Sequence, residues 1–304
     1  MADVPELPEV EALARFLDGR TRARTVTAVE VGDIAALKTY DPPVDALVGA
    51  TVRGWARHGK WLDMSTEAGE APAGPGAPHL LAHLSRGGWV RWYDDVPERP
   101  VRPRLGGSSR GAAVALRVRL DDGSGLDLTE AGTTRRLAVH VVRSPDDVPQ
   151  VATLGVEPLS PQLTPEALGA LLRRKNQQVK GLLRDQSAIA GIGNAYSDEI
   201  LHVARFSPYK QTRSFTDEET AVLHSAVVTT LTEAVAAASG RPAKELKDAK
   251  RAGMRVHGRT GQPCPVCGDT VREVSFADRS LQYCPTCQTG GRPLADRRMS
   301  RLLR

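Results

Sequence analysis

The amino-terminal segment of this chain places side by side two residue types that together suit nucleophilic chemistry. Pro5 and Glu6 are followed by Leu-Pro-Glu-Val-Glu, which continues into helix-forming residues. A proline with a free nitrogen is a secondary amine, and an α-amino group, with a pKa of about 8 against about 10.4 for lysine, is substantially unprotonated at neutral pH. Such an amine can attack a sugar C1′ and form an iminium, while the neighbouring carboxyl group moves the protons that this reaction requires.

The same residues also have a purely structural reading. Pro8 suits the first turn of a helix, where a missing N–H costs nothing, and two glutamates in that turn complement the positive end of the helix dipole. In this sequence Met1-Ala2-Asp3-Val4 precede Pro5, and an acylated proline nitrogen has no nucleophilic lone pair. We expect the natural start to be Val4, because GTG encodes valine internally and can initiate translation as methionine, whose removal frees Pro5.

The cysteines form a second group of residues with a defined chemistry. The chain has 4 cysteines, arranged as two C-x2-C pairs, Cys264 with Cys267 and Cys284 with Cys287. Four thiolates at this spacing predict one structural Zn²⁺ per chain, in a tetrahedral site with no open position, so the metal organises rather than catalyses. A redox pair is the alternative. Structural zinc contributes about 10 to 16 kcal/mol, enough to hold a hairpin with little core.

A third candidate is the glycine-rich string from Asp185 to Glu199. Gly191, Gly193 and Asn194 lie between apolar helical segments, which predicts a tight helix-two-turn-helix junction. The glycines permit positive φ and a close backbone approach, and the amides that open the next helix point at an anion. As an N-cap, Asn194 could also donate its side-chain amide to a phosphate. Residue by residue, an ordinary glycine-broken turn explains the same sequence.

Composition limits the class of protein. A chain of 304 residues accommodates two domains. The net charge of +5 and the pI near 9.2 favour a polyanionic partner. A mean hydropathy of -0.31, with no run of eighteen apolar residues and no signal-peptide pattern, predicts a cytoplasmic protein without a membrane span. We expect it to be a monomer.

The elements that must position these residues differ between the two halves of the chain. The first half predicts a helix over residues 8–18 and then short strands, which is typical of a β-sandwich with one leading helix. The strands are expected over residues 25–31, 51–56, 60–64, 79–84, 88–93, 114–120 and 126–129.

Helices dominate the second half. Thr164-Pro165-Glu166 predicts a helix start, and Thr216 with Glu219 predicts a capping box for a helix that runs to Gly240. The expected fold is therefore α+β, with a β-sandwich, then a helix-two-turn-helix domain and a zinc-ribbon β-hairpin. The predicted domains are an N-terminal β-sandwich at 1–150, a helical domain at 163–255, a zinc finger at 256–290 and a basic tail at 291–304.

From Pro5 to Cys287 the sequence resembles the formamidopyrimidine-DNA glycosylase and endonuclease VIII (Fpg/Nei) family. The resemblance rests on the PELPEVE start, the Gly-Ile-Gly-Asn string and the paired cysteines. It implies a base-excision-repair glycosylase with AP lyase activity on damaged double-stranded DNA. In such an enzyme Pro5 attacks C1′ of a flipped nucleotide, Glu6 and Lys60 assist base loss and ring opening, and Arg279 holds phosphate during β,δ-elimination.

The resemblance also implies DNA contacts. Lys60, after His58-Gly59, matches a lysine that reaches the damaged nucleotide's phosphate, although a lone lysine is usually surface decoration. His83 matches a phosphate contact. Arg86 stands where the family has a methionine wedge that fills the space of the flipped base, and its guanidinium fills that space differently. A core histidine and an exposed arginine are the structural alternative.

Contacts by three further arginines follow from the resemblance. Arg135 and Arg136 match an Arg-Arg-Phe loop that contacts phosphate and the opposite base, and Leu137 would replace the aromatic wedge. Two adjacent arginines on a hairpin are otherwise a solvated edge. Arg279, five residues before Cys284, matches the zinc-finger arginine that grips the phosphates flanking the lesion.

Two rival functions stay open from the sequence. One is a DNA-binding protein that keeps the fold and has lost catalysis, because Pro5 is blocked and the wedge residues differ. The other is a monofunctional glycosylase in which Glu6 activates water. The lysine-rich segment 243–251 is shorter than the lesion-covering loop of 8-oxoguanine-specific members, so strict specificity for that base is not expected. The sequence names neither the lesion nor its opposite base.

Overall fold

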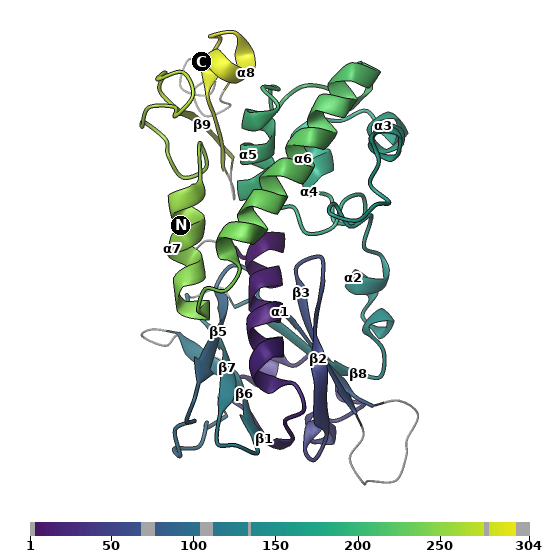
Figure 1. Ribbon diagram of the computed structural model, residues 1–304, viewed down its shortest axis with the longest axis vertical. Helices are drawn as coiled ribbons and strands as arrows, with labels where there is room; N and C mark the ends of the chain where they lie inside the picture. Colours follow the sequence, from purple (N-terminus) through teal and green to yellow (C-terminus); the bar gives the residue numbers. More distant parts are fainter. Residues whose placement is uncertain (1–3, 68–76, 104–111, 133–134, 277–279, 296–304) are drawn as a thin grey trace. The chain divides into compact units, whose positions relative to one another are not determined.

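The computed structural model describes residues 4–67, 77–103, 112–132, 135–276 and 280–295 (Figure 1). The chain forms two compact units. The first contains Met1–Thr153 and Ala238–Lys247, and the second contains Leu154–Ala237 and Asp248–Arg304. The first unit is rich in β-strands and the second is mostly helical.

The first unit consists of one long helix and two antiparallel sheets. The elements in order are α1 (Leu7–Thr21), β1 (Val26–Val31), η1 (Ile34–Ala36), η2 (Val44–Leu47), β2 (Thr51–His58), β3 (Trp61–Glu67), β4 (His79–His83), β5 (Gly88–Tyr93), β6 (Ala113–Leu120), β7 (Gly125–Glu130), β8 (Ala138–Val142), η3 (Pro145–Asp147), α2 (Pro149–Ala152) and η5 (Ala243–Glu245). Within the described residues, one sheet has the strand order β1-β6-β7-β5 and the other β2-β3-β4-β8.

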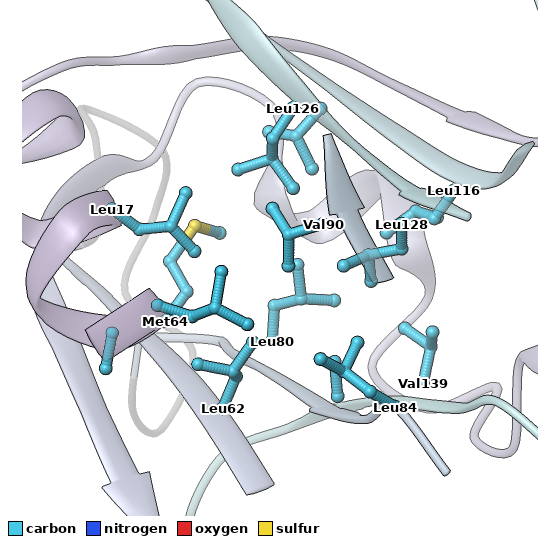
Figure 2. Packing of buried hydrophobic residues seen from close by; sticks show 14 of the residues in the cluster. Leu17, Leu62, Met64, Leu80, Leu84, Val90, Leu116, Leu126, Leu128 and Val139 are labelled. Atoms are coloured by element: carbon cyan, nitrogen blue, oxygen red, sulfur yellow. The ribbon is translucent and has the colours of Figure 1, made fainter. Parts of the chain in front are cut away.

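The core of this unit is apolar and is built from both sheets and from α1. Figure 2 shows Leu62, Met64 and Leu80 from one sheet with Leu126 and Leu128 from the other, packed in a single cluster. All of them are at most 1% exposed. Burial of such side chains is the main driving force for folding, and it accounts for a sandwich of two sheets. The expected β-sandwich with a leading helix is therefore confirmed.

Helix α1 packs against β2 and β3. Its start agrees with the sequence, because the Glu9 carboxylate accepts the Glu6 backbone N–H at 2.8 Å. The helix continues to Thr21, three residues beyond the predicted end at residue 18. Tertiary hydrogen bonds support this extra turn: Asp18 Oδ1 accepts the Trp55 backbone N–H at 2.9 Å, and Thr21 Oγ1 accepts the indole N–H of the same residue at 2.8 Å.

The second unit contains α3 (Pro165–Arg174), α4 (Val179–Arg184), α5 (Asn194–Val203), η4 (Thr212–Ser214), α6 (Asp217–Ala238), α7 (Leu246–Gly253), whose first two residues lie in the first unit, then β9 (Arg272–Ser275), β10 (Ser280–Tyr283) and α8 (Pro285–Thr289). Both predicted caps are confirmed. Thr164 Oγ1 accepts the Ala167 N–H at 3.2 Å, and Thr216 and Glu219 form a reciprocal capping box.

In the described part of the chain, α6 has the length and composition of a membrane span. A buried helix of a water-soluble domain meets the same criterion. Leu223, Val227 and Leu231, spaced by four residues along α6, are each 0% exposed. This spacing places them on one face of the helix, as in a core helix of the second unit.

Strands β9 and β10 form an antiparallel hairpin that ends beside the cysteines. Its apolar content is small: one cluster contains Val256, Cys264, Val271 and Cys284. A module with so little core needs another source of stability, as the predicted zinc site would supply. The helical region with a zinc-ribbon hairpin is confirmed.

Candidate active site and metal centre

The start of α1 places Pro5 and Glu6 in a buried position. Pro5 is buried, and Glu6 and Glu9 are each 2% exposed. Glu6 is the N-cap residue, so it adjoins the orphan N–H groups and the positive end of the helix dipole. A carboxyl group shielded from water beside a potential nucleophile is suited to carrying a proton to and from a reacting group.

Lys60 lies on the two-residue turn between β2 and β3. Gly59 has a φ of +57°, which a side-chain-bearing residue rarely adopts, and His58 pairs with Trp61 across the turn. Arg57 ties this turn to α1, because its Nε donates to Glu11 Oε2 at 2.9 Å and its Nη1 donates to the Gly59 carbonyl at 3.0 Å. The turn that carries Lys60 is thus fixed to the helix that carries Glu6.

His83 ends strand β4 next to this turn. It pairs with Trp61 in the sheet, and the two ring centroids lie 4.9 Å apart. Burial lowers the pKa of His83 to about 4, and the positive charge of Lys60 contributes to the shift. His83 is therefore neutral at physiological pH, so any hydrogen bond that its ring donates carries no positive charge.

Arg86 is exposed on the tight turn between β4 and β5. The turn depends on glycine, because a Cβ at Gly87 would lie 2.1 Å from the carbonyl oxygen of Ala131. In return, the Ala131 N–H donates to the Gly87 carbonyl at 2.9 Å. The Arg86 turn is thereby attached to the segment that follows β7, which leads to the two adjacent arginines.

In that segment Arg135, Arg136 and Leu137, all predicted to act on DNA, have three different environments. Arg136 is exposed, whereas Arg135 Nη1 donates to Asp33 Oδ2 at 2.7 Å. Glu130, 4% exposed, accepts the Leu137 backbone N–H at 2.8 Å. Leu137 is 2% exposed and belongs to the sandwich core, so the prediction that it acts as a wedge is wrong.

The glycine-rich string is a turn between α4 and α5 held by an unpredicted residue. Gln186 Oε1 accepts the Gly191 N–H at 2.9 Å, and its Nε2 donates to the Ile192 carbonyl at 2.7 Å. Gly191 has the expected positive φ of +84°, whereas Gly193 has a φ of −125°. Only Gly191 therefore needs glycine for its backbone conformation.

The predicted N-cap role of Asn194 is wrong. Gly193 is the N-cap of α5 and Asn194 is the first helical residue. The Asn194 side-chain Nδ2 donates to the Ser280 carbonyl at 2.8 Å, which links the helix start to the zinc-ribbon hairpin. One N–H of this amide is therefore engaged, and the amide group carries a second N–H.

A buried ion pair that the sequence analysis did not identify supports this helix start. Lys180 Nζ donates to Asp198 Oδ1 at 2.6 Å and to Ser197 Oγ at 2.7 Å. The other carboxylate oxygen of Asp198 lies 2.8 Å from His257 Nδ1 and accepts the Gln282 N–H at 3.2 Å. Asp198 thus joins α4, α5 and the hairpin. Asp198 lies within the glycine-rich string, and this position was the sequence signal from which its role could have been predicted.

Glu199 holds the segment that leads into the cysteines. It is 3% exposed and accepts three consecutive backbone N–H groups, from Arg255 at 2.7 Å, Val256 at 2.9 Å and His257 at 2.8 Å. Burial raises the pKa of Glu199, although these backbone hydrogen bonds oppose the shift. The Glu199 carboxyl group thus supplies the acceptors that the backbone N–H groups of this turn need in a buried position.

The four cysteine sulfurs fit a tetrahedral zinc ion. All four lie within 4.8 Å of one another, with 3.9 Å between Cys264 and Cys287 and 3.3 Å between Cys267 and Cys284. Zn–S bonds of about 2.3 Å place neighbouring sulfurs about 3.8 Å apart. Burial raises the pKa of Cys287 to about 11, so a cation is needed to make it a thiolate at neutral pH. Arg279 lies outside the described residues.

Comparison with known proteins agrees with this arrangement. Residues 4–137 match the formamidopyrimidine-DNA glycosylase N-terminal domain, residues 154–244 the formamidopyrimidine-DNA glycosylase H2TH domain, and residues 261–290 a zinc finger found in FPG and IleRS. A formamidopyrimidine-DNA glycosylase of Symbiobacterium thermophilum is 33% identical over 295 residues, which are 94% of this chain and 89% of that protein. An uncharacterized formamidopyrimidine-DNA glycosylase-like protein of Mycobacterium tuberculosis is 54% identical over 156 residues, 51% of this chain and 98% of that protein.

Solved structures share the fold. The MutM (Fpg) protein of Thermus thermophilus superposes with a TM-score of 0.75 at 29% identity, over 95% of this chain and 100% of that one. The Lactococcus lactis Fpg, in a complex with DNA containing an abasic site, superposes with a TM-score of 0.77 at 23% identity, over 93% of this chain and 99% of that one. The chain belongs to the formamidopyrimidine-DNA glycosylase family of DNA-repair enzymes and is a DNA glycosylase.

Proposed function

We propose that this glycosylase removes oxidised or otherwise damaged bases from double-stranded DNA and then cleaves the strand, with Pro5 as its nucleophile. The observation that carries the proposal is the buried Pro5-Glu6 pair at the start of α1, on the same helix that holds the Lys60 turn through Arg57 and Glu11. Relatives named formamidopyrimidine-DNA glycosylases support the substrate class. We further propose that the enzyme acts as a monomer in the bacterial cytoplasm.

The chemistry needs a free amine at Pro5. The family match begins at residue 4, and the proposal requires that the residues before Pro5 be absent from the mature chain. The lone pair of Pro5 then bonds to C1′ while the bond from C1′ to the base breaks, and the base departs with a proton. Ring opening places a proton on O4′ and leaves an iminium between Pro5 and C1′.

Strand cleavage follows from this iminium. Loss of a proton from C2′ breaks the C3′–O bond, and loss of a proton from C4′ breaks the C5′–O bond, which releases both phosphates. Water then hydrolyses the iminium and regenerates Pro5. Glu6 carries the protons, and the cationic Lys60 and Arg279 stabilise the phosphates. Zinc, held by the four cysteines, has a structural role in this scheme.

DNA binding divides between the two units in this proposal. Arg86 and Arg136 are exposed in the first unit and are suited to contacts with the DNA strands. In the second unit, the amides at the start of α5 and the free N–H of the Asn194 amide are suited to a phosphate. His83 would add a neutral hydrogen bond. Arg135 would act indirectly, because Asp33 already binds its guanidinium.

Borohydride trapping on an abasic duplex tests the proposal. Two chains are compared, one that starts at Met-Pro5 and loses its methionine, and one that retains the four residues before Pro5. We expect a trapped covalent adduct with the first chain and none with the second, and loss of damaged-base release in Glu6→Gln. Pro8→Ala, which alters the helix start without touching the amine, is the control and should still be trapped.

Three outcomes would overturn the proposal of a lyase with Pro5 as its nucleophile. Equal trapping by both chains would place the nucleophile elsewhere. Release of the base without an adduct, from the chain that starts at Pro5, would assign the monofunctional reaction in which Glu6 activates water. Tight binding of damaged DNA with neither activity would assign a non-catalytic damage sensor, the second candidate, which the four residues before Pro5 favour.

A further inference from the structure

A histidine outside the cysteine pairs contacts the candidate zinc site. His202 lies on α5 and is 3% exposed. Its Nε2 lies 3.2 Å from Cys264 Sγ, a distance at which an imidazole N–H hydrogen-bonds to sulfur. His202 does not belong to the group of side chains whose ligand atoms lie mutually close enough to share one ion, which contains only the four cysteines in the described part of the chain. It therefore contacts a metal ligand rather than completing the coordination.

The second ring nitrogen of His202 shows which nitrogen carries the proton. Nδ1 is buried and has no hydrogen-bond partner in the part of the chain that the structure describes. A hydrogen on Nδ1 would be an unsatisfied buried donor and would leave Nε2 a bare acceptor. A metal-bound thiolate can only accept a hydrogen bond. The tautomer that satisfies both conditions has its hydrogen on Nε2, directed at Cys264.

Two of the other cysteines receive comparable donors from the backbone. The Asp269 N–H is directed at Cys267, and the Cys287 N–H at Cys284. Four thiolates around one Zn²⁺ leave a net charge of about −2, so each N–H donor directed at a sulfur stabilises the site. Cys264 is 2% exposed, and the donor that reaches it is a side chain on α5, 62 residues earlier in the chain.

We propose that His202 is an outer-sphere ligand of the zinc site, whose Nε2–H donates to the Cys264 thiolate and sets how tightly the finger retains its metal. Groups that hydrogen-bond to metal ligands orient those ligands, and their loss typically costs 10- to 100-fold in metal affinity. His202 thus also joins the metal site to α5, the helix whose start is suited to a phosphate. The proposal is independent of the nucleophile assigned to Pro5.

The test compares zinc retention in three variants of the full-length chain. His202→Leu removes the donor at similar volume, His202→Gln keeps an N–H of similar reach, and His224→Gln is the control, since His224 lies on α6 in the same unit and contacts the Leu163 carbonyl. The rate of zinc transfer to a chromophoric chelator is measured for each, together with the sulfur-to-metal charge-transfer band after cobalt substitution.

We expect His202→Leu to lose zinc 10- to 100-fold faster with a shifted cobalt band, His202→Gln to recover most of both properties, and His224→Gln to match the wild type. Wild-type retention and an unchanged band in His202→Leu would refute the proposal. If that variant does not fold, the ¹¹³Cd-loaded wild-type protein decides: a scalar coupling between cadmium and the His202 Nε2–H supports the proposal, and a hydrogen on Nδ1 overturns it.

Discussion

Replacement of Lys180 by methionine should strongly destabilise the second unit, because it removes one half of a buried ion pair. The ammonium group contacts the Asp198 carboxylate at 2.6 Å, the Ser197 hydroxyl at 2.7 Å and the Asn194 carbonyl at 3.1 Å. The side chains of Lys180 and Asp198 are 7% and 0% exposed, so water cannot replace the lost donor. Removal of one partner from such a pair costs about 3 to 5 kcal/mol.

The distribution of tryptophan makes this loss measurable in the intact protein. All four tryptophans, at positions 55, 61, 89 and 92, lie in the first unit, whereas most long helices lie in the second. Urea unfolding of zinc-loaded Lys180→Met followed by far-ultraviolet circular dichroism should therefore show an earlier transition. The transition followed by tryptophan fluorescence should change much less.

Two controls isolate the buried pair. Arg173→Met removes an exposed pair with Asp217, whose side chains are 62% and 92% exposed, and should leave the transition unchanged. The double variant Lys180→Met with Asp198→Leu should recover part of the loss, because it leaves no uncompensated buried charge. A loss below about 1 kcal/mol in Lys180→Met, or a double variant no more stable than the single one, would refute the reasoning.

Three further predictions concern pH, DNA binding and the metal. Burial pushes the pKa of Asp63 upward, but hydrogen bonds from His58 and His79 overcome this effect and hold the pKa below its ordinary value. The stability that results is present above the unfolded pKa of about 3.9 and is lost as pH falls through the folded pKa. In urea unfolding, the advantage of wild type over Asp63→Asn should therefore disappear in acid. Arg136→Ala should weaken binding to abasic DNA and flatten its salt dependence, whereas Arg135→Ala should mainly lower the melting temperature; the reverse pattern would contradict the pairing of Arg135. Removal of zinc by a chelator should lower the helical transition temperature and DNA affinity together, and unchanged values would argue against a structural metal.

Local signals predicted most of the fold. Apolar alternation identified β5 at its observed bounds, residues 88–93, and side-chain caps at Thr164 and Thr216 identified the starts of α3 and α6. Both signals depend on residues within a few positions of one another, and such interactions are the ones that a single sequence displays. The paired cysteines are predictable for the same reason, because ligand spacing within each knuckle is local.

Leu137 shows where reasoning from family position failed. Matching it to an aromatic wedge placed it in a loop, yet Leu137, Val139 and Val141 alternate along the chain and are 2%, 1% and 0% exposed. Alternation with a period of two is itself a strand signal. It corresponds to the buried face of β8 and to the residue directly before that strand. Arg135 differs, because its partner Asp33 lies 102 residues away and no local pattern indicates the pair.

The zinc-ribbon hairpin is held by one face of α5, and this feature could not be read from the sequence. Asn194, Asp198 and His202 follow one another at intervals of four residues, so they lie on the same side of the helix. Each contacts the region around the hairpin: Asn194 binds the Ser280 carbonyl, Asp198 the Gln282 N–H, and His202 the Cys264 sulfur. Polar contacts are directional, and the apolar clusters of this module are small. The orientation of the hairpin therefore depends on hydrogen bonds to α5 more than on burial, so substitution of Asp198 or His202 should change DNA affinity although neither residue is proposed to contact DNA.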